Sequence, residues 1–242
     1  MKVIILSAGR GSRIKKFTNL KPKCFIKINN KSILDRLLKN FEINNLNNIS
    51  IITGYKNHLF KKFGIKKILN KKWKITNMVY SLFLAKKILL KNSCIICYSD
   101  IIFDNRIIKK LQDHKDRNLI PYNSNWKINW KRRYKNPYSD LEKFIFNSKN
   151  EVLEIGGAAK SSKQVMGQYM GILKLSQDVS IKLYNFYKTL SKKDRMKISM
   201  TDFLQKFTNE TKFRFKTLKI NYEWHEIDTF KDFKVAKKYL KN

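Results

Sequence analysis

The first half of the chain alternates short apolar runs with longer segments of helical periodicity. Runs that predict strands buried on both faces lie at residues 3–7, 49–53, 65–69 and 93–98. Residues 33–42 and 79–90 place apolar side chains at helical spacing, which predicts two amphipathic helices. This alternation is typical of an α/β fold with a mostly parallel sheet.

The second half of the chain is less regular. Strands, partly antiparallel, are predicted at residues 118–122, 143–146, 152–155, 170–175 and around 213–220. Helices are predicted at residues 179–190, 200–207 and 230–239. There is no internal repeat and no linker rich in Pro, Ser or Gly, so we expect residues 1–242 to form one domain.

The charge balance is strongly basic, with 53 Lys and Arg against 18 Asp and Glu and a net charge of +35. A nucleic-acid-binding protein would have such a charge. The cations are scattered among many Asn and Ile residues, however, without a basic stripe, so a biased genomic composition explains them better. In either case the field favours polyanionic ligands.

The sequence argues against a membrane protein. No apolar run approaches the roughly 20 residues that span a bilayer. The apolar start ends after a few residues without a cleavage site, so we interpret it as a buried strand of a cytoplasmic protein. Cys24, Cys94 and Cys97 are too few for a disulfide framework. Cys94 and Cys97, three apart on a predicted strand, should point to opposite faces as reduced core residues.

A Gly-rich segment follows the first strand directly. Gly9 and Gly11 would let backbone N–H groups approach phosphate oxygens. The segment is neither a dinucleotide fingerprint nor a Walker loop. Arg13 and Lys23, with Thr18 between them and Pro22 preceding the lysine, add two cations. Such a loop with two cations suits a triphosphate whose charge must be neutralised before attack on its α-phosphorus.

These residues resemble the nucleotidyltransferase family, in which Gly-x-Gly-x-Arg is followed by Thr and Pro-Lys. That family includes sugar-1-phosphate nucleotidyltransferases and choline-phosphate cytidylyltransferases. The resemblance implies a Rossmann-like, three-layer (GT-A-like) α/β fold with a mixed, mostly parallel sheet. It also implies a nucleotide-binding part at about residues 1–115 and an acceptor-binding part at about 116–225. Ser7 departs from the family, which usually has Ala there.

The resemblance assigns roles to individual residues. Arg13 would grip the β- and γ-phosphates, and Lys23 would stabilise charge at the α-phosphate as a catalytic residue. The residues expected to bind the nucleotide are Leu6, Ala8, Gly9, Gly11, Arg13, Lys23, Asn77 and Ser81. Asn77 and Ser81 lie in the stretch Asn77-Met78-Val79-Tyr80-Ser81-Leu82, which resembles the Asn-x-x-Tyr-Ser-Leu helix start near the base in the cytidylyltransferase branch. The expected donor is therefore CTP, and such enzymes serve cell-surface polysaccharide, lipid or phosphonate biosynthesis.

Three acidic residues are candidates for binding Mg²⁺, the expected cofactor. Asp100 follows a predicted strand at the edge where α/β sheets bind ligands. Glu226 and Asp228, two apart, would face the same side of an extended segment. Asp228 could instead cap the helix at residue 230, but the resemblance places a metal-binding Asp in such a Glu-Ile-Asp-Thr motif. His225 is next to this pair, and we expect no role for it.

The acceptor is less well defined. Tyr169 lies in a stretch that resembles the acceptor-side strand of the family, and Trp126, Trp130 and Arg133 are candidates to bind an ammonium or a phosphate. Alternatively, the two tryptophans form the apolar side of a surface helix. Phosphocholine, aminoethylphosphonate and an amino-acid phosphate remain open as acceptors. The alternatives are a sugar-1-phosphate nucleotidyltransferase, and a nucleic-acid-binding protein on the same scaffold. The oligomeric state is left open, with a monomer or a dimer equally compatible.

Overall fold

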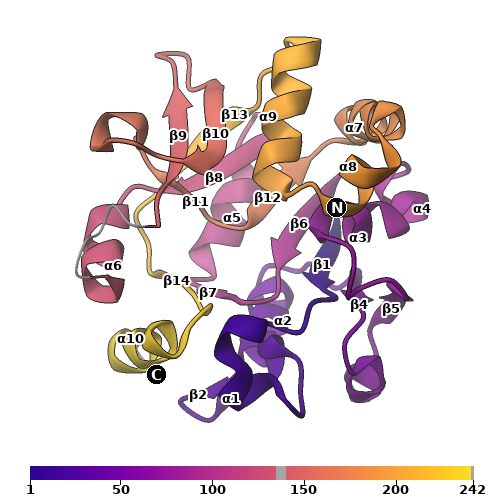
Figure 1. The fold of residues 1–242 in the computed structure, drawn as a ribbon, viewed down its shortest axis with the longest axis vertical. Helices are drawn as coiled ribbons and strands as arrows, with labels where there is room; N and C mark the ends of the chain where they lie inside the picture. The colour runs from indigo at the N-terminus through magenta and orange to yellow at the C-terminus, as the bar shows by residue number, and fades with distance from the viewer. Residues whose placement is uncertain (135–139, 241–242) are drawn as a thin grey trace.

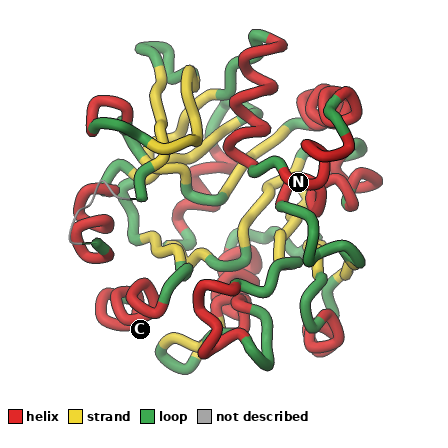
Figure 2. The backbone as a smooth tube through the Cα atoms, in the orientation of Figure 1, coloured by secondary structure: helices red, strands yellow, loops and turns green. Residues whose placement is uncertain are grey.

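The computed structural model describes residues 1–134 and 140–240, and its centre is one mixed sheet (Figures 1 and 2). The strands follow one another in the order β11-β8-β12-β6-β1-β4-β5, and β13 pairs with β8. Their bounds are β1 Lys2–Ser7, β4 Ile49–Thr53, β5 Lys66–Leu69, β6 Cys94–Tyr98, β8 Leu119–Asn123, β11 Gln168–Tyr169, β12 Ile172–Leu175 and β13 Lys216–Ile220. Strands β6, β1, β4 and β5 are parallel, whereas β12 runs antiparallel to β6. The predicted α/β fold with a mixed sheet is confirmed.

Both faces of the sheet are covered, which makes three layers. Along β1, Val3 and Ile5 pack in one apolar cluster and Ile4 and Leu6 in the other. The first cluster includes α2 (Ile33–Ile43), α5 (Arg106–Asp113), α6 (Trp126–Arg133) and α10 (Phe230–Tyr239). The second includes α3 (Met78–Leu84), α4 (Lys86–Leu89), α7 (Gln177–Thr189) and α9 (Met200–Thr211). Continuous apolar runs in the central strands are therefore explained by burial on both sides.

Smaller elements complete the chain. Strands β7 (Ile101–Phe103) and β14 (Trp224–Glu226) form a two-stranded antiparallel pair, as do β9 (Glu142–Phe146) with β10 (Val152–Ala158) and β2 (Lys27–Ile28) with β3 (Lys31–Ser32). The remaining helices are α1 (Lys15–Thr18) and α8 (Lys192–Lys197), with 3₁₀ turns η1 (Ser12–Ile14), η2 (Lys23–Phe25), η3 (Asn57–Phe63) and η4 (Ser162–Gln164). In Figure 1, α3, α4, α7 and α8 gather on one side of the molecule and α10 lies on the other.

Three predicted elements have different bounds in the structure. The helix predicted at residues 79–90 is two helices, α3 and α4, separated at Ala85. The strand predicted at 170–175 begins only at Ile172, after Gly171, whose φ of 73° and close approach to the Tyr98 ring leave no room for a side chain. The strand predicted to begin near residue 213 starts at Lys216.

The cysteines behave as expected. Cys24, Cys94 and Cys97 are free and buried, and Cys94 and Cys97 belong to the clusters on opposite faces of the sheet. Within residues 1–134 and 140–240, no helix is both long enough and apolar enough to cross a bilayer.

Candidate active site

Hydrogen bonds from nearby residues stabilise the Gly-rich loop. Gly11 has φ of 75°, a conformation that suits glycine. Thr18, fully buried, donates its hydroxyl to the Gly11 carbonyl (3.0 Å), and Arg10 donates to Asn19 Oδ1 (2.8 Å). The sequence motif included Thr18, and the structure places it as a support of the loop. The loop is thus braced at two points before any ligand binds.

Lys23 meets both aspartates of the predicted metal site. Pro22 precedes the 3₁₀ turn η2, in which Lys23 is the first residue. The Lys23 Nζ donates to Asp100 Oδ2 (2.7 Å) and to Asp228 Oδ1 (2.6 Å). Arg13 Nη2 lies 2.8 Å from Asp228 Oδ2 while most of its side chain stays exposed. The two predicted phosphate-binding cations and two predicted metal ligands therefore form one cluster.

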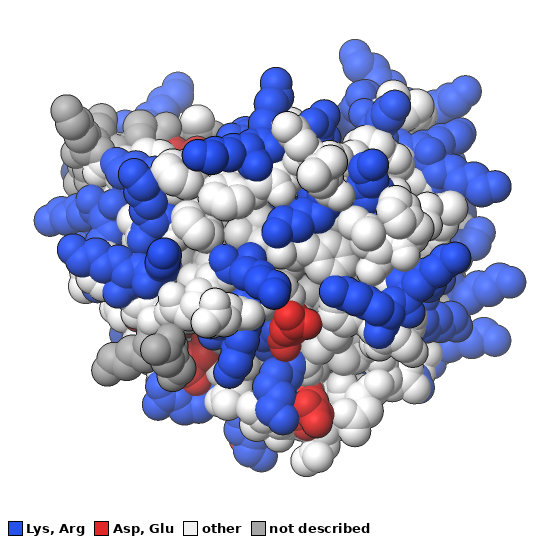
Figure 3. Space-filling model, turned by 90° about the horizontal axis from the view of Figure 1, so that it is seen from below, with Lys and Arg blue, Asp and Glu red and all other residues white. Residues whose placement is uncertain are grey.

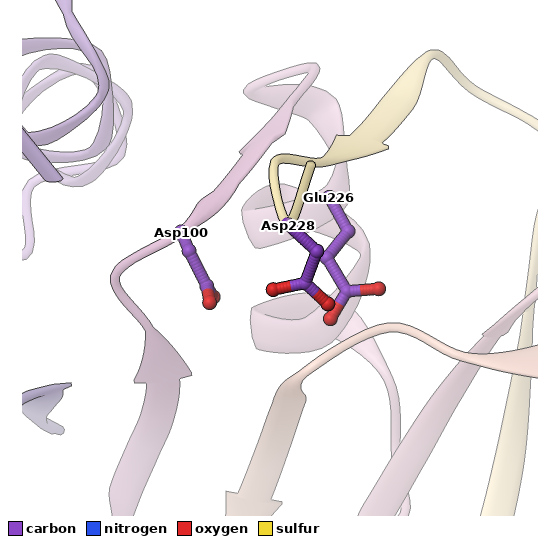
Figure 4. A group of neighbouring side chains, drawn as sticks. All are labelled: Asp100, Glu226 and Asp228. Atoms are coloured by element: carbon purple, nitrogen blue, oxygen red, sulfur yellow. The ribbon is translucent and has the colours of Figure 1, made fainter. Parts of the chain in front are cut away.

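The small β7–β14 pair brings the carboxylates together. Ile101, directly after Asp100, is in register with Glu226, and Ile227 N donates to Asp100 O (2.9 Å). One oxygen each from Asp100, Glu226 and Asp228 lies within 4.8 Å of the others. Figure 4 shows Glu226 and Asp228 side by side, with Asp100 on the neighbouring segment. The sequence predicted these three residues as one site, and the structure places them together.

The cluster has unusual proton affinities. Burial and then repulsion by Asp228 and Asp100 raise the pKa of Glu226 to about 8, so its carboxyl is mostly protonated at neutral pH without a metal. Burial acts to raise the pKa of Asp228, but Lys23 and Arg13 outweigh it and hold that pKa below its ordinary value. For Lys23, burial acts to lower the pKa, and attraction by Asp100 and Asp228 raises it above its ordinary range. Lys23 is a permanent cation here.

This donor set fits Mg²⁺. The ion prefers carboxylate oxygens, and the three carboxyl groups converge from two segments. Asp100 Oδ1 is buried without a hydrogen-bond partner, which leaves an oxygen available to a cation. The alternative role of Asp228 as a helix cap is wrong: α10 is capped by Thr229, which accepts from Asp232 N in a capping box.

A cleft of about 220 Å³ opens beside this cluster. Its lining includes every residue predicted to bind the nucleotide except the exposed Arg13, namely Leu6, Ala8, Gly9, Gly11, Lys23, Asn77 and Ser81. Trp73 also lines it and was missed, because nothing in its local sequence distinguishes it from a surface aromatic. Asn77 caps α3 through Met78 N (2.7 Å) and donates to Lys197 O (3.1 Å).

The acceptor candidates lie mostly in the core. Trp126 and Trp130 are each only 3% exposed, and the Trp130 ring stacks on Trp224. Arg133 is also buried and pairs with Asp232 (2.7 Å). These positions favour packing over recognition, which is the alternative interpretation of that helix. Tyr169 remains beside the cleft, with its ring against the cleft-lining Tyr98.

A larger cleft, of about 1070 Å³, lies elsewhere. It is lined by residues of α2, the β7–α5 segment, the loop around Tyr222 before β14, and the end of α10 near Leu240. His225 faces this cleft and lies 2.6 Å from Glu223. The His225 side chain, next to Glu226 in sequence, therefore points away from the carboxylate cluster. The smaller cleft is the candidate active site because Lys23, Asp100 and the Gly-rich loop line it, beside the cluster of Arg13, Glu226 and Asp228.

Comparisons with known proteins identify the family of this chain. A family model for the MobA-like NTP transferase domain matches residues 3–127. The chain is 31% identical to CTP:phosphoglutamine cytidylyltransferase of Campylobacter jejuni, over 97% of this chain and 98% of that protein. It is 34% identical to a choline-phosphate cytidylyltransferase of Streptococcus pneumoniae over 43% of this chain and 47% of that protein.

The fold is shared as well. A solved structure of CTP:phosphocholine cytidylyltransferase from Streptococcus pneumoniae aligns over 99% of both chains with a TM-score of 0.74 at 20% identity. This likeness is one of fold, and it confirms the expected nucleotidyltransferase architecture. From the family match and the near full-length relative, the chain belongs to the MobA-like NTP transferase family and is a nucleotidyltransferase, in the branch that contains these cytidylyltransferases.

Proposed function

We propose that this protein transfers the cytidylyl group of CTP to a phosphorylated small molecule and releases pyrophosphate. The observation that carries the proposal is the contact of Lys23 with both Asp100 and Asp228 beside the Gly-rich loop. A binding module would not need a buried cation placed between two candidate metal ligands at the mouth of a nucleotide-sized cleft.

The proposed reaction is an in-line displacement. An oxygen of the acceptor phosphate attacks the α-phosphorus of CTP, a new phosphorus–oxygen bond forms, and the bond to the β-phosphate oxygen breaks. Lys23 stabilises charge on the α-phosphate, and Arg13 with the loop amides holds the departing pyrophosphate. The acceptor phosphate is already an anion near neutral pH, so the step does not need a general base.

Asp100, Asp228 and Glu226 are the residues that would hold Mg²⁺. When bound, the ion supplies a positive charge that polarises the phosphate oxygens and orients the triphosphate. Lys23 now occupies the space between Asp100 and Asp228, so its ammonium becomes available to a phosphate when a second cation neutralises those carboxylates.

Among the acceptors, we favour an amino-acid phosphate. The relative from Campylobacter jejuni, which aligns over 97% of this chain at 31% identity, acts, by its name, on phosphoglutamine, whereas the match to a choline-phosphate enzyme covers less than half of the chain. The acceptor-binding part is the part that this longer alignment includes. Three unpaired cysteines and a nucleotide substrate are compatible with the cytoplasmic location expected from the sequence.

The test is pyrophosphate release from each of the four nucleoside triphosphates with Mg²⁺ and a panel of acceptors. The panel contains glutamine phosphate, phosphocholine, aminoethylphosphonate and glucose 1-phosphate. We expect release with CTP and the first acceptor. Release only with the sugar phosphate would favour the sugar-1-phosphate alternative. No release from any pair, together with specific binding of duplex or RNA at physiological salt, would contradict the proposal in favour of a nucleic-acid-binding protein.

A further inference from the structure

Arg133 is buried next to the carboxylate cluster. It is the last residue of α6, and its side chain is only 5% exposed. Its guanidinium carbon lies 4.8 Å from the centroid of the Trp130 ring and 5.2 Å from that of the Tyr134 ring. A cavity of about 10 Å³ beside it has room for roughly one water molecule. That space is too small for an acceptor phosphate, so the charge of Arg133 has another role.

Asp232 anchors this guanidinium to the segment that carries two of the carboxylates. Arg133 Nε donates to Asp232 Oδ1 (2.7 Å), and Asp232 is 2% exposed. The other oxygen, Oδ2, accepts from Asp228 N (3.1 Å) and Thr229 N (2.7 Å). The desolvation cost of a buried ion pair is offset only when hydrogen bonds satisfy its remaining polar groups, and Asp232 meets this condition. The pair therefore fixes both the backbone at Asp228 and the direction of the guanidinium.

The other side of the guanidinium faces Glu226. Arg133 Nη1 lies 3.8 Å from Glu226 Oε2, which is about 1 Å longer than a charge-assisted hydrogen bond. Nη1 and Nη2 are buried and have no hydrogen-bond partner among residues 1–134 and 140–240, although buried donors are rarely left unpaired. A carboxylate has two oxygens, so Glu226 can accept from Arg133 with one and offer the other to a cation.

We propose that Arg133, anchored by Asp232, is a positioning residue that orients Glu226 to bind Mg²⁺. Groups that hydrogen-bond a metal ligand fix its direction, and their loss typically lowers metal affinity by about 10–100-fold. The guanidinium is also a cation close to a cation site, and this repulsion acts in the opposite direction. Orientation and repulsion therefore predict opposite changes in metal affinity when the guanidinium is removed. The inference rests on the metal site of the proposed function.

Arg133→Lys isolates the effect of orientation, because lysine keeps the charge but has no planar fork of donors. The measurement is a titration of the protein with Mn²⁺, a paramagnetic substitute for Mg²⁺, followed by electron paramagnetic resonance without nucleotide or acceptor. We expect the variant to bind Mn²⁺ about tenfold or more weakly than the native protein does. Excess Mg²⁺ should displace Mn²⁺ from the native protein.

Arg132→Lys is the matched control. Arg132 is the preceding residue of α6, is 28% exposed and lies 3.8 Å from Glu223, outside the carboxylate cluster. The same substitution there should leave the Mn²⁺ affinity within about twofold of the native value.

A double variant separates positioning from general damage. In the background of Glu226→Gln, Arg133→Lys should weaken Mn²⁺ binding by about threefold or less, because the carboxylate through which Arg133 acts is gone. A merely structural role would weaken binding by the same factor in both backgrounds.

Asp232→Asn is a second variant for the case in which Arg133→Lys does not fold. It keeps the size of the side chain, removes the charge that anchors the guanidinium, and should also weaken Mn²⁺ binding by about tenfold or more. Native or tighter Mn²⁺ binding by a folded Arg133→Lys, or by Asp232→Asn in its place, would overturn the inference. An equal factor in the two Glu226 backgrounds would overturn it as well.

The outcomes are distinct from those of the transfer assay. Weaker Mn²⁺ binding by Arg133→Lys, without pyrophosphate release from the native protein with any acceptor, would support this inference and contradict the proposed transfer. Pyrophosphate release by the native protein, with unchanged Mn²⁺ affinity in Arg133→Lys, would do the reverse. A native protein that binds no Mn²⁺ would overturn both the metal site and this inference.

Discussion

Lys23 connects segments that are distant in the sequence, because its ammonium bonds a carboxylate after β6 and another after β14. The contact with Asp228 spans 205 positions. In a site that develops negative charge on a phosphate, removal of one such stabilising group costs about 10²–10³ in turnover. Removal also leaves two carboxylates facing each other without a counter-charge.

We therefore expect Lys23→Ala to lower kcat by about 10²–10³-fold in the pyrophosphate assay. Without Mg²⁺ the variant should also have a lower Tm than the native protein, and Mg²⁺ should restore much of the difference. Lys27→Ala, which removes an exposed lysine of β2, is the matched control and should change neither quantity. Near-normal turnover of Lys23→Ala would refute the role assigned to this residue.

Glu226 leads to a prediction about pH. Its folded-state pKa of about 8 lies far above that of a carboxyl in an unfolded chain, roughly 4.3. A group with a raised pKa contributes stability that is fully present below the unfolded pKa and is lost as the pH rises through the folded pKa. The metal-free protein should therefore lose stability between about pH 5 and pH 8 through this group.

Glu226→Gln removes this titration because the amide stays neutral. In EDTA, the Tm of the variant should increase relative to the native Tm as the pH is raised from about 5 to 9. Glu210→Gln, at an exposed position of α9, should show no such trend. A Tm difference for Glu226→Gln that is independent of pH would show that the pKa of Glu226 is not raised.

At the level of elements, the Gly-rich loop offers a matched pair of substitutions. A Cβ on Gly9 would meet no atom within 4 Å, whereas one on Gly11 would lie 2.8 Å from Lys23 Cε. Gly11 also has φ of 75°, where an L-residue is strained by about 1–3 kcal/mol. Gly11→Ala should thus destabilise the protein and displace Lys23, and both effects come from the protein alone.

Gly9→Ala instead tests whether the triphosphate approaches the backbone of the loop. We expect its Tm to match the native value, with a change in stability under about 0.5 kcal/mol. If phosphate oxygens approach the backbone closely here, the added methyl group should weaken CTP binding by about tenfold or more in a calorimetric titration. Native CTP affinity in Gly9→Ala would mean that the triphosphate does not approach this residue.

The sequence alone predicts elements with strong local signals. Helix α10 was expected at 230–239 and is found there, because the Thr229 and Asp232 capping box fixes its start. Strand β4 likewise matches the predicted residues. The boundary between α3 and α4 at Ala85 was not predicted, because no Gly or Pro marks it in the sequence. Strand β7 was not predicted, since three apolar residues form a strand only through their pairing with distant β14.

In the candidate site, too, the features with local sequence signals were predicted and those that depend on distant contacts were not. Spacing identified the loop and its cations, but the meeting of Asp100 with Asp228 depends on pairing across the chain and was implied only by the family resemblance. For Trp126 and Trp130 the sequence left recognition and packing open, and their burial favours packing.

On the scale of the whole molecule, the carboxylate cluster lies within a strongly basic protein. The net charge is +35, and Figure 3 shows Lys and Arg over much of one face with acidic groups in a few places. A field of this sign raises the local concentration of an anionic ligand and speeds its encounter with the site. Salt screens that field, with a Debye length of about 10 Å at 0.1 M and about 3 Å at 1 M.

The rate at which CTP associates with the protein should therefore depend on salt more strongly than the rate of the chemical step. We expect kcat/KM for CTP to fall about fivefold or more between 0.05 and 0.5 M NaCl, at fixed Mg²⁺ and saturating acceptor, because long-range attraction is screened. The value of kcat should change by less than about twofold, since Lys23, only 12% exposed, acts at short range inside the cleft. The Tm should rise over the same range as repulsion among the cations weakens. If kcat/KM does not respond to salt while the Tm does, the charge affects stability without guiding the substrate, which favours biased composition as the reason for the many lysines.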